Sequence, residues 1–197
     1  MNSSRQHSAT TRWRPYSCFL RSTLPAELSS WLLDTASLTL RLQQLCPGSF
    51  RVRVLSQASG APRADEAQLL EMSQGQRAIV RQVQLLCDGQ PWIYARTVIP
   101  VTSLRGRLRR LAHLGTRPLG GMLFADRGMR RGTVQLARIR AGQALYVTAT
   151  SGLQPPPAEI WGRRSVFRIA GKPLLVSELF LPGFPAAGAS RPLWKSR

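Results

Sequence analysis

Apolar positions near the start of the chain recur at helical spacing and predict two neighbouring helices. Residues 23–34 have a proline near their start and apolar side chains on one face, and residues 37–45 begin at Ser37, a residue type that caps helices. Leucine spacing predicts a third helix at 102–115, closed by a glycine, and a short helical turn at 117–124. These segments are all short, so we expect them to pack against a sheet.

Most of the remaining apolar positions alternate with polar ones, the pattern of strands that place one face on a core. Strands are predicted on this basis at 50–55, 77–87, 91–100, 133–140, 144–150, 163–170 and 173–182. Turn residues at Asp88-Gly89 and at Gly171-Lys172 join two pairs of these strands into hairpins.

Helices followed by hairpin-linked strands predict a single α+β domain with a largely antiparallel sheet. A chain of 197 residues, 43% of them hydrophobic, is long enough for one sizeable core. We assign the domain to 15–185, with disordered tails at 1–14 and 186–197. Residues 58–76 form a looser stretch, and the three prolines in 152–160 predict a loop.

The formal net charge of +19 is the difference between 28 basic and nine acidic residues. Lys172 and Lys195 are the only lysines, so nearly all of the basic residues are arginines. Aromatic residues do not interleave with the arginines as a stacking platform requires, so we predict no nucleic-acid partner. The charge would attract a small anionic substrate instead. Because the chain has no apolar run of roughly 18 residues and no apolar export signal, we expect a cytoplasmic protein without stable membrane insertion.

Cysteines and histidines are few and form no ligand motif. Cys18, Cys46 and Cys87 show no CxxC spacing and are interpreted as reduced thiols, as in a cytosolic protein. His7 and His113 lie far apart, without an accompanying cluster of cysteines or aspartates. We therefore predict no protein-built metal site.

Two charged residues stand on apolar strand faces, where a lone charge costs several kcal/mol. By period-two alternation, Glu178 shares its face with Leu174, Val176 and Phe180, and Arg81 shares its face with Ile79, Val83, Leu85 and Cys87.

One interpretation is an Arg81–Glu178 salt bridge that only fixes the fold. The other is a dry pocket in which Arg81 receives a substrate carboxylate and Glu178 performs acid chemistry. A third feature is "WGRRS", residues 161–165, which indicates either an anion-binding segment or a turn glycine beside solvated arginines.

Four segments, taken in order, resemble the chorismate lyase family: "WLLDTASLTLRL", "RQVQLLCDGQPWIYARTVIP", "LGTRPLGGMLF" and "WGRRSVFRIAGKPLLVSELFLP". The resemblance implies an antiparallel sheet of about six strands with helical flaps over an internal ligand site. It places the family's substrate-binding arginine at Arg81 and its essential glutamate at Glu178. A leucine whose backbone helps to bind the ligand falls at Leu119, and a flap position that is Met in some members is Leu38 here.

The family removes pyruvate from chorismate and releases 4-hydroxybenzoate for ubiquinone synthesis. The resemblance therefore implies a carbon–oxygen lyase that needs no cofactor or metal, binds a small acid and acts as a monomer. The segment between Arg140 and Trp161 is longer than in a compact member, which leaves the local strand register open. The alternative is a non-catalytic small-acid effector domain of the same fold. Regulators of that kind carry a DNA-binding module, and we expect too few residues for one before the first helix.

Overall fold

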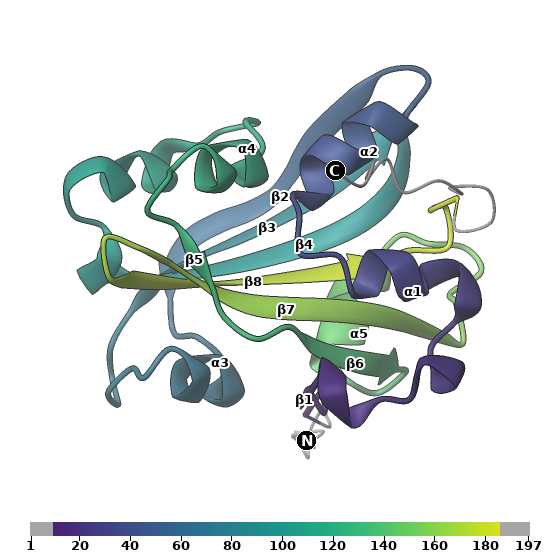
Figure 1. The fold of residues 1–197 in the computed structure, drawn as a ribbon, viewed down its shortest axis with the longest axis horizontal. Helices are drawn as coiled ribbons and strands as arrows, with labels where there is room; N and C mark the ends of the chain where they lie inside the picture. Colours follow the sequence, from purple (N-terminus) through teal and green to yellow (C-terminus); the bar gives the residue numbers. More distant parts are fainter. Residues whose placement is uncertain (1–9, 186–197) are drawn as a thin grey trace, which may run out of the picture.

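A single antiparallel sheet runs through the computed structural model, which describes residues 10–185 (Figure 1). Its strands are β1 (Arg14–Pro15), β2 (Phe50–Gly60), β3 (Ala78–Cys87), β4 (Gln90–Pro100), β5 (Arg130–Arg131), β6 (Gln135–Arg140), β7 (Glu159–Ile169) and β8 (Lys172–Phe180). They are ordered β1-β6-β7-β8-β4-β3-β2, and β5 pairs with β7 beside this path. The six long strands form the predicted antiparallel sheet, to which β1 and β5 each add two residues.

Both predicted hairpins are present. Asp88 and Gly89 join β3 to β4 with positive φ angles of 49° and 81°, the conformation of a tight turn that matches the twist of its strands. The turn between β7 and β8 uses Ala170 and Gly171, one position earlier than the Gly171-Lys172 turn that we predicted.

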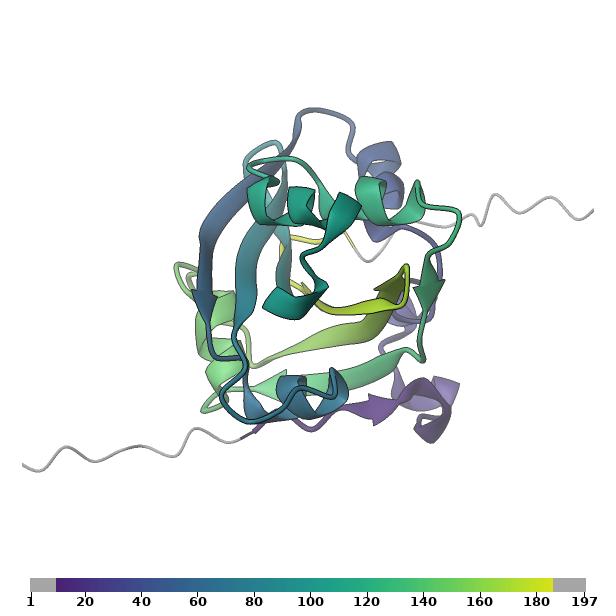
Figure 2. The same cartoon turned by 90° about the vertical axis from the view of Figure 1, so that its left-hand side faces the viewer.

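Helices cover both faces of the strongly curved sheet (Figure 2). The α-helices are α1 (Ala26–Leu32), α2 (Leu38–Leu45), α3 (Ala64–Leu69), α4 (Leu119–Phe124) and α5 (Ala144–Thr150), and the 3₁₀ helices are η1 (Tyr16–Cys18), η2 (Arg21–Thr23), η3 (Val101–Ser103) and η4 (Gly106–His113). The predicted cap of α2 is confirmed, since the Ser37 hydroxyl accepts from the Leu40 N–H. Helices α1, α2 and α4 lie over the concave face, and α3 and α5 lie on the other.

Three sequence-based element predictions need correction. Residues 144–150 form α5 and not a strand, because Leu145, Tyr146 and Ala149 meet the sheet at helical spacing. The predicted helix at 102–115 consists of 3₁₀ turns, interrupted where Gly106 has a positive φ of 54°. Residues 58–76 are not all loose, since β2 extends to Gly60 and α3 follows it.

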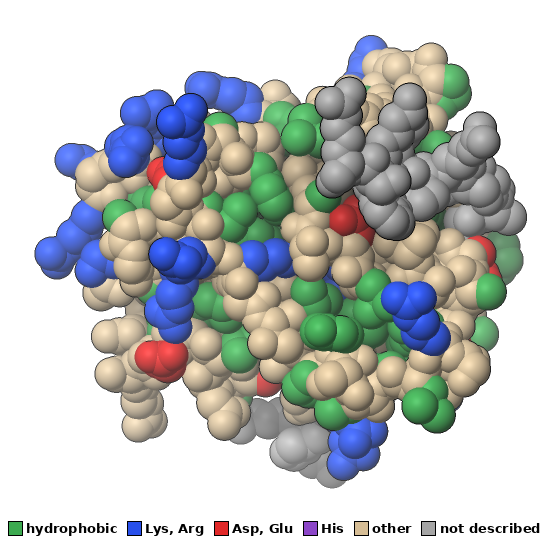
Figure 3. Space-filling model, viewed as in Figure 1, with side chains coloured by type: hydrophobic (Ala, Val, Ile, Leu, Met, Phe, Trp, Pro, Cys, Tyr) green, Lys and Arg blue, Asp and Glu red, His purple; other side chains and the backbone are tan. Residues whose placement is uncertain are grey.

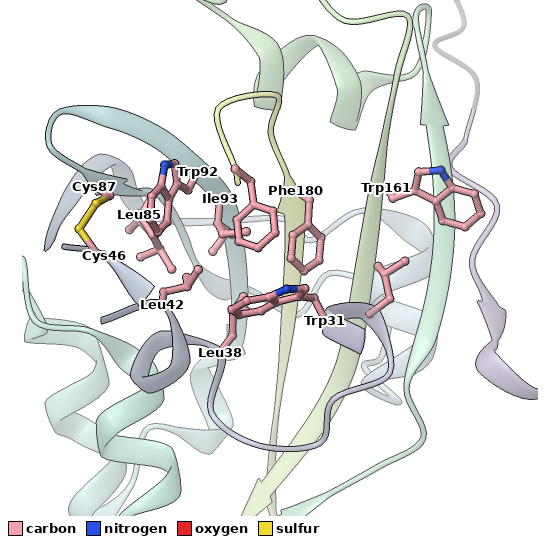
Figure 4. Packing of buried hydrophobic residues seen from close by; sticks show 14 of the residues in the cluster. Trp31, Leu38, Leu42, Cys46, Leu85, Cys87, Trp92, Ile93, Trp161 and Phe180 are labelled. Carbon is pink, nitrogen blue, oxygen red and sulfur yellow. A yellow bond between two sulfur atoms is a disulfide. The ribbon is translucent and has the colours of Figure 1, made fainter. Parts of the chain in front are cut away.

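A large apolar cluster fills the space between the concave face and helices α1 and α2 (Figure 4). The cluster includes the indole ring of Trp31, from α1, and the rings of Phe180 and Phe184. The two phenylalanine rings meet edge to face, with their centroids 5.2 Å apart. Cys46 and Cys87 form a disulfide within the same cluster, so their prediction as reduced thiols is wrong in this structure. The bond ties the end of α2 to the end of β3, while Cys18 is a free, exposed thiol.

The structured region begins before the boundary that we predicted at residue 15. Trp13 packs against a buried cluster and lies 4.8 Å from the Arg164 guanidinium, and Arg14 pairs with Leu136 of β6. The rest of the predicted tails, 1–9 and 186–197, lies outside the described residues.

Exposed arginines gather at the end of the molecule formed by η4, α4 and β5 (Figure 3). They include Arg107, Arg110, Arg127 and Arg130, with Asp126 among them. Within residues 10–185, no helix has the length and apolar character required to cross a membrane.

Candidate active site

A cavity lies between the concave face of the sheet and the two helices α2 and α4. The empty space between them amounts to about 590 Å³, part of it open to solvent. Its walls are mainly apolar, with Val83, Leu85, Phe167 and Val176 rising from the strands. Such a dry wall strengthens the electrostatic effect of any charge placed in it.

The structure places all four sequence-predicted site residues around this cavity. Arg81 comes from β3 and Glu178 from β8, while Leu38 begins α2 and Leu119 begins α4. Arg81 pairs with Thr97 of β4, and Glu178 pairs with Ala95 of the same strand, two positions away. Because alternate positions share a face, this register puts both charges on the concave side.

Glu178 is held by Arg163, which the sequence placed in the candidate anion-binding segment 161–165 but did not pair with Glu178. Arg163 pairs with Glu178 in the β7–β8 register, and its Nε donates to the Glu178 Oε2 at 2.7 Å. Its Nη1 donates to the carbonyl oxygens of Trp31 and Asp34, each at 2.6 Å. With a relative exposure of 1%, Arg163 is among the most buried residues of the protein.

This arrangement excludes two of the sequence-based interpretations. No Arg81–Glu178 salt bridge forms, because Glu178 pairs with Arg163. The "WGRRS" segment is not a turn with solvated arginines, since Gly162 lies inside β7 and both Arg163 and Arg164 are buried. The anion-binding interpretation of this segment stays a prediction.

Arg81 lies buried in the cavity wall without an acidic partner among residues 10–185. Its Nη1 donates to the Gln57 Oε1 at 2.8 Å and its Nη2 to the Arg117 carbonyl oxygen at 3.5 Å. Burial lowers the pKa of Arg81, since the charged guanidinium loses hydration there. A ligand carboxylate would supply the missing counter-charge.

A third guanidinium, that of Arg131 from β5, lines the same cavity, and the sequence analysis did not predict it as a site residue. Its Nε donates to the Ser165 hydroxyl at 3.0 Å and its Nη1 to the Asp34 carbonyl oxygen at 3.2 Å. Burial, and secondly the nearby Arg163, lower the pKa of Arg131 to about 10. No sequence signal could have found it, since "RR" after a glycine-containing loop carries neither strand nor helix periodicity.

Helices α2 and α4 close the cavity where a glycine allows them to touch. A Cβ on Gly120 would lie 2.9 Å from the Thr39 Oγ1 and 3.0 Å from the Ser37 Oγ. The neighbouring Gly121 has nothing within 4 Å of the corresponding position. Gly120 therefore permits the close approach of α2 and α4, the two helical flaps over the cavity.

Charged residues also form a network on the opposite face of the sheet. Arg96 donates to the buried Glu66 through Nε at 2.7 Å, and Arg164 pairs with Asp65, also of α3. Burial alone would raise the pKa of Glu66, but the hydrogen bond and charge of Arg96 outweigh it and the pKa is lowered. These groups satisfy one another, and we assign them to the docking of α3.

Among residues 10–185, potential metal ligands are not gathered in the cavity. In the described part of the chain, the potential ligands that come close together are Cys46, Cys87 and Asp88. The two sulfur atoms are bonded to each other, so neither is available as a thiolate ligand.

Comparison with known proteins decides the family. The family model described as "Chorismate lyase" matches residues 11–186. The chain belongs to the chorismate lyase family.

Curated relatives of this chorismate lyase family member are named as chorismate pyruvate-lyases. A protein named "Probable chorismate pyruvate-lyase" from Azoarcus sp. strain BH72 is 46% identical over 81% of this chain and 86% of its own length. A protein of the same name from Aromatoleum aromaticum is 41% identical over 90% and 95% of the two chains.

Solved structures show the same fold at low sequence identity. The C-terminal domain of the histidine utilization repressor from Pseudomonas syringae has a TM-score of 0.51 at 14% identity, over 75% of this chain and all of that one. The ligand-binding domain of a GntR-family regulator from Bordetella bronchiseptica has a TM-score of 0.50 at 21% identity, over 70% and 87%. The antiparallel α+β fold with helices around the sheet is thus common to the lyase family and these domains.

Proposed function

We propose that this protein eliminates pyruvate from chorismate and leaves 4-hydroxybenzoate, as a carbon–oxygen lyase. The observation that carries the proposal is the placement of Arg81 and the Arg163–Glu178 pair in one largely apolar cavity. Chorismate has a carboxylate on its ring and an enolpyruvyl ether elsewhere on that ring, so the substrate needs a cation at one end and a polar reacting group at the other.

Arg81 binds the ring carboxylate in this proposal. Its guanidinium is desolvated, has no acidic partner in the described chain and presents planar paired donors, which match a carboxylate. The backbone of Leu119 and the side chain of Leu38 close over the ring from the flaps and exclude water. Exclusion of water strengthens the charge interactions at the reacting bond.

Glu178 acts at the reacting end. The ether C–O bond to the ring breaks, a ring carbon loses its proton as the ring becomes aromatic, and the departing enolpyruvyl CH₂ gains a proton to become pyruvate. Arg163 orients the Glu178 carboxyl group, which is placed to transfer a proton or to stabilise charge as the ether oxygen departs. Aromatisation drives the reaction, so positioning is the main task of the catalyst.

The overall reaction is redox-neutral, so we propose that it needs no cofactor. We further propose that the protein is a cytoplasmic monomer that supplies 4-hydroxybenzoate for ubiquinone synthesis. The relatives named as chorismate pyruvate-lyases support the proposed lyase activity.

The direct test is incubation of the purified protein with chorismate, with 4-hydroxybenzoate and pyruvate both quantified over time. We expect equal amounts of the two products, and no turnover by a folded Glu178→Gln variant beyond the slow background. Saturable binding of 4-hydroxybenzoate without any turnover of chorismate would instead support the effector-domain alternative.

A further inference from the structure

The charges that line the cavity do not balance. Arg81, Arg131 and Arg163 contribute three positive charges, and Glu178 contributes at most one negative charge. With Glu178 ionised, the cavity wall carries a net charge of +2. The proposed substrate is a dicarboxylate, whereas 4-hydroxybenzoate and pyruvate each carry one carboxylate. The net charge of +2 on the cavity wall therefore matches the two negative charges of the substrate. If Arg81 binds one carboxylate, a second cation must bind the other.

Arg163 is poorly suited to be that cation. Its Nε and Nη1 already donate to three protein oxygen atoms, all within 2.7 Å. Arg131 is less committed, because its two hydrogen bonds go to a hydroxyl and a carbonyl, both neutral. Its Nη2 makes no hydrogen bond to residues 10–185, and none of its atoms is both buried and unpaired.

The sheet register separates Arg131 from Arg81. Arg81 pairs with Thr97, Thr97 with Val176, and Val176 with Ser165, whose hydroxyl holds Arg131. Three strand spacings of about 4.8 Å put the backbones of Arg81 and Ser165 roughly 14 Å apart.

The guanidinium of Arg131 interacts electrostatically with groups on the Glu178 side of the cavity. Arg163 and Glu178 both perturb the pKa of Arg131, whereas that of Arg81 reflects burial alone. A ring held at Arg81 with its ether at Glu178 would therefore direct its enolpyruvyl group toward Arg131.

We propose that Arg131 receives the enolpyruvyl carboxylate of the substrate and so sets the preference of this site for a dicarboxylate. This inference rests on the proposed function and adds a substrate-binding residue to it. The carboxylate would compensate a guanidinium that is half-buried, has no acidic group in salt-bridge contact among the described residues, and has its desolvation only partly offset by the charges of Glu178 and Asp34. After the C–O bond breaks, Arg131 would hold pyruvate while Arg81 holds the aromatic product.

The test compares Arg131→Gln with Arg130→Gln, which removes the same charge from the exposed neighbouring position of β5. We expect Arg131→Gln to raise the KM for chorismate by about 30-fold or more, the scale for loss of a buried charged partner. Its Kd for 4-hydroxybenzoate, measured by isothermal titration calorimetry, should change less than about threefold. Arg130→Gln should leave both constants within about twofold of wild type, since an exposed charge contributes little. Equal losses for chorismate and 4-hydroxybenzoate, or no loss for either, would overturn the inference.

A second measurement on the unmodified protein keeps the inference testable if Arg131→Gln folds poorly in thermal melts. Pyruvate should bind the protein already saturated with 4-hydroxybenzoate, because the two monocarboxylates occupy different arginines. Strict competition between them would contradict the assignment. Absence of chorismate turnover by the wild-type protein would count against the proposed function itself, whereas normal turnover with strict competition would count against Arg131 alone.

Discussion

Arg163 and Glu178 are direct neighbours across strands β7 and β8, and the Arg163 Nε donates to the Glu178 Oε2 at 2.7 Å. The backbone carbonyls of Trp31 and Asp34 fix the rest of the guanidinium from the other side. Glu178 is consequently anchored through one oxygen to a nearly inaccessible cation while its carboxyl group lines the cavity. A group held in this way loses little entropy when it acts on a bound substrate.

We expect Glu178→Gln to lower kcat by roughly 10²- to 10⁴-fold, the usual worth of a positioned acid or base. The amide oxygen can still accept from Arg163, but the side chain can no longer transfer a proton. The Kd for 4-hydroxybenzoate should stay within about threefold, since the shape is kept. Wild-type turnover by folded Glu178→Gln protein would make Glu178 a structural or binding carboxylate.

Replacement of Arg81 by Ala should weaken the binding of both chorismate and 4-hydroxybenzoate by a few kcal/mol, because the ring carboxylate of each ligand loses its cationic partner. Arg117→Ala is the matched control, since Arg117 accepts from Arg81 through its backbone carbonyl, which alanine retains. Calorimetric titration with 4-hydroxybenzoate measures the effect, and thermal melts check the fold. Unchanged affinity in Arg81→Ala would remove Arg81 from the binding site.

The sequence was most informative where a local rule was broken. Asp88-Gly89 supplies the two positive φ angles of a tight turn, which predicted the β3–β4 hairpin. Arg81 and Glu178 were found because a charge on an apolar strand face requires compensation. Val83, Leu85 and Val176, which alternation placed on the same faces as these two charges, line the cavity with them.

Features that depend on tertiary contacts were beyond this reasoning. The β-branched and aromatic residues of 144–150 resemble a strand, yet Leu145 and Ala149 pack as a helix against Ile139. Arg163 could be assigned to Glu178 only from the β7–β8 register. The Cys46–Cys87 pairing joins positions 41 residues apart and requires the docking of α2 on β3.

Reduction of the Cys46–Cys87 disulfide should lower the free energy of unfolding by about 4 kcal/mol, the loop-entropy estimate for a closed loop of this length. The double replacement of Cys46 and Cys87 by Ala should show a similar loss that no longer depends on reductant. Urea unfolding with and without dithiothreitol measures both effects. Cys18→Ala is the control, since this exposed thiol is unpaired and its loss should change little. Equal stability of oxidised and reduced protein would contradict this account.

Tyr94 should contribute to alkaline unfolding. Burial raises the pKa of Tyr94 from 10.0 to about 12, and its hydroxyl donates to the Gln82 Oε1. Because the folded pKa is above the unfolded one, the stabilisation is complete below pH 10 and is lost as the pH rises from 10 to 12. The loss amounts to about 2–3 kcal/mol at roughly 1.4 kcal/mol per pKa unit.

The Tyr94→Phe variant tests this window directly. It should be less stable at pH 8 by about 1 kcal/mol, through loss of one hydrogen bond. Between pH 10 and 12, however, it should lose less stability than wild type in urea unfolding. Parallel curves for the two proteins would show that Tyr94 does not titrate in this range.

The contact between α2 and α4 should control how long the product stays bound. In Gly120→Ala, the new methyl group would lie 2.9 Å from the Thr39 Oγ1 and would push the two flaps apart. Gly121→Ala adds the same methyl group, with the same gain in helix propensity, to a position with nothing within 4 Å. Because a closed flap must open to release product, we expect faster dissociation of 4-hydroxybenzoate and a higher Kd for Gly120→Ala alone.

Stopped-flow displacement of 4-hydroxybenzoate compares the two variants with wild type. If release limits turnover, kcat for Gly120→Ala should rise together with the dissociation rate. Identical dissociation rates in the three proteins would show that the α2–α4 contact does not gate the cavity.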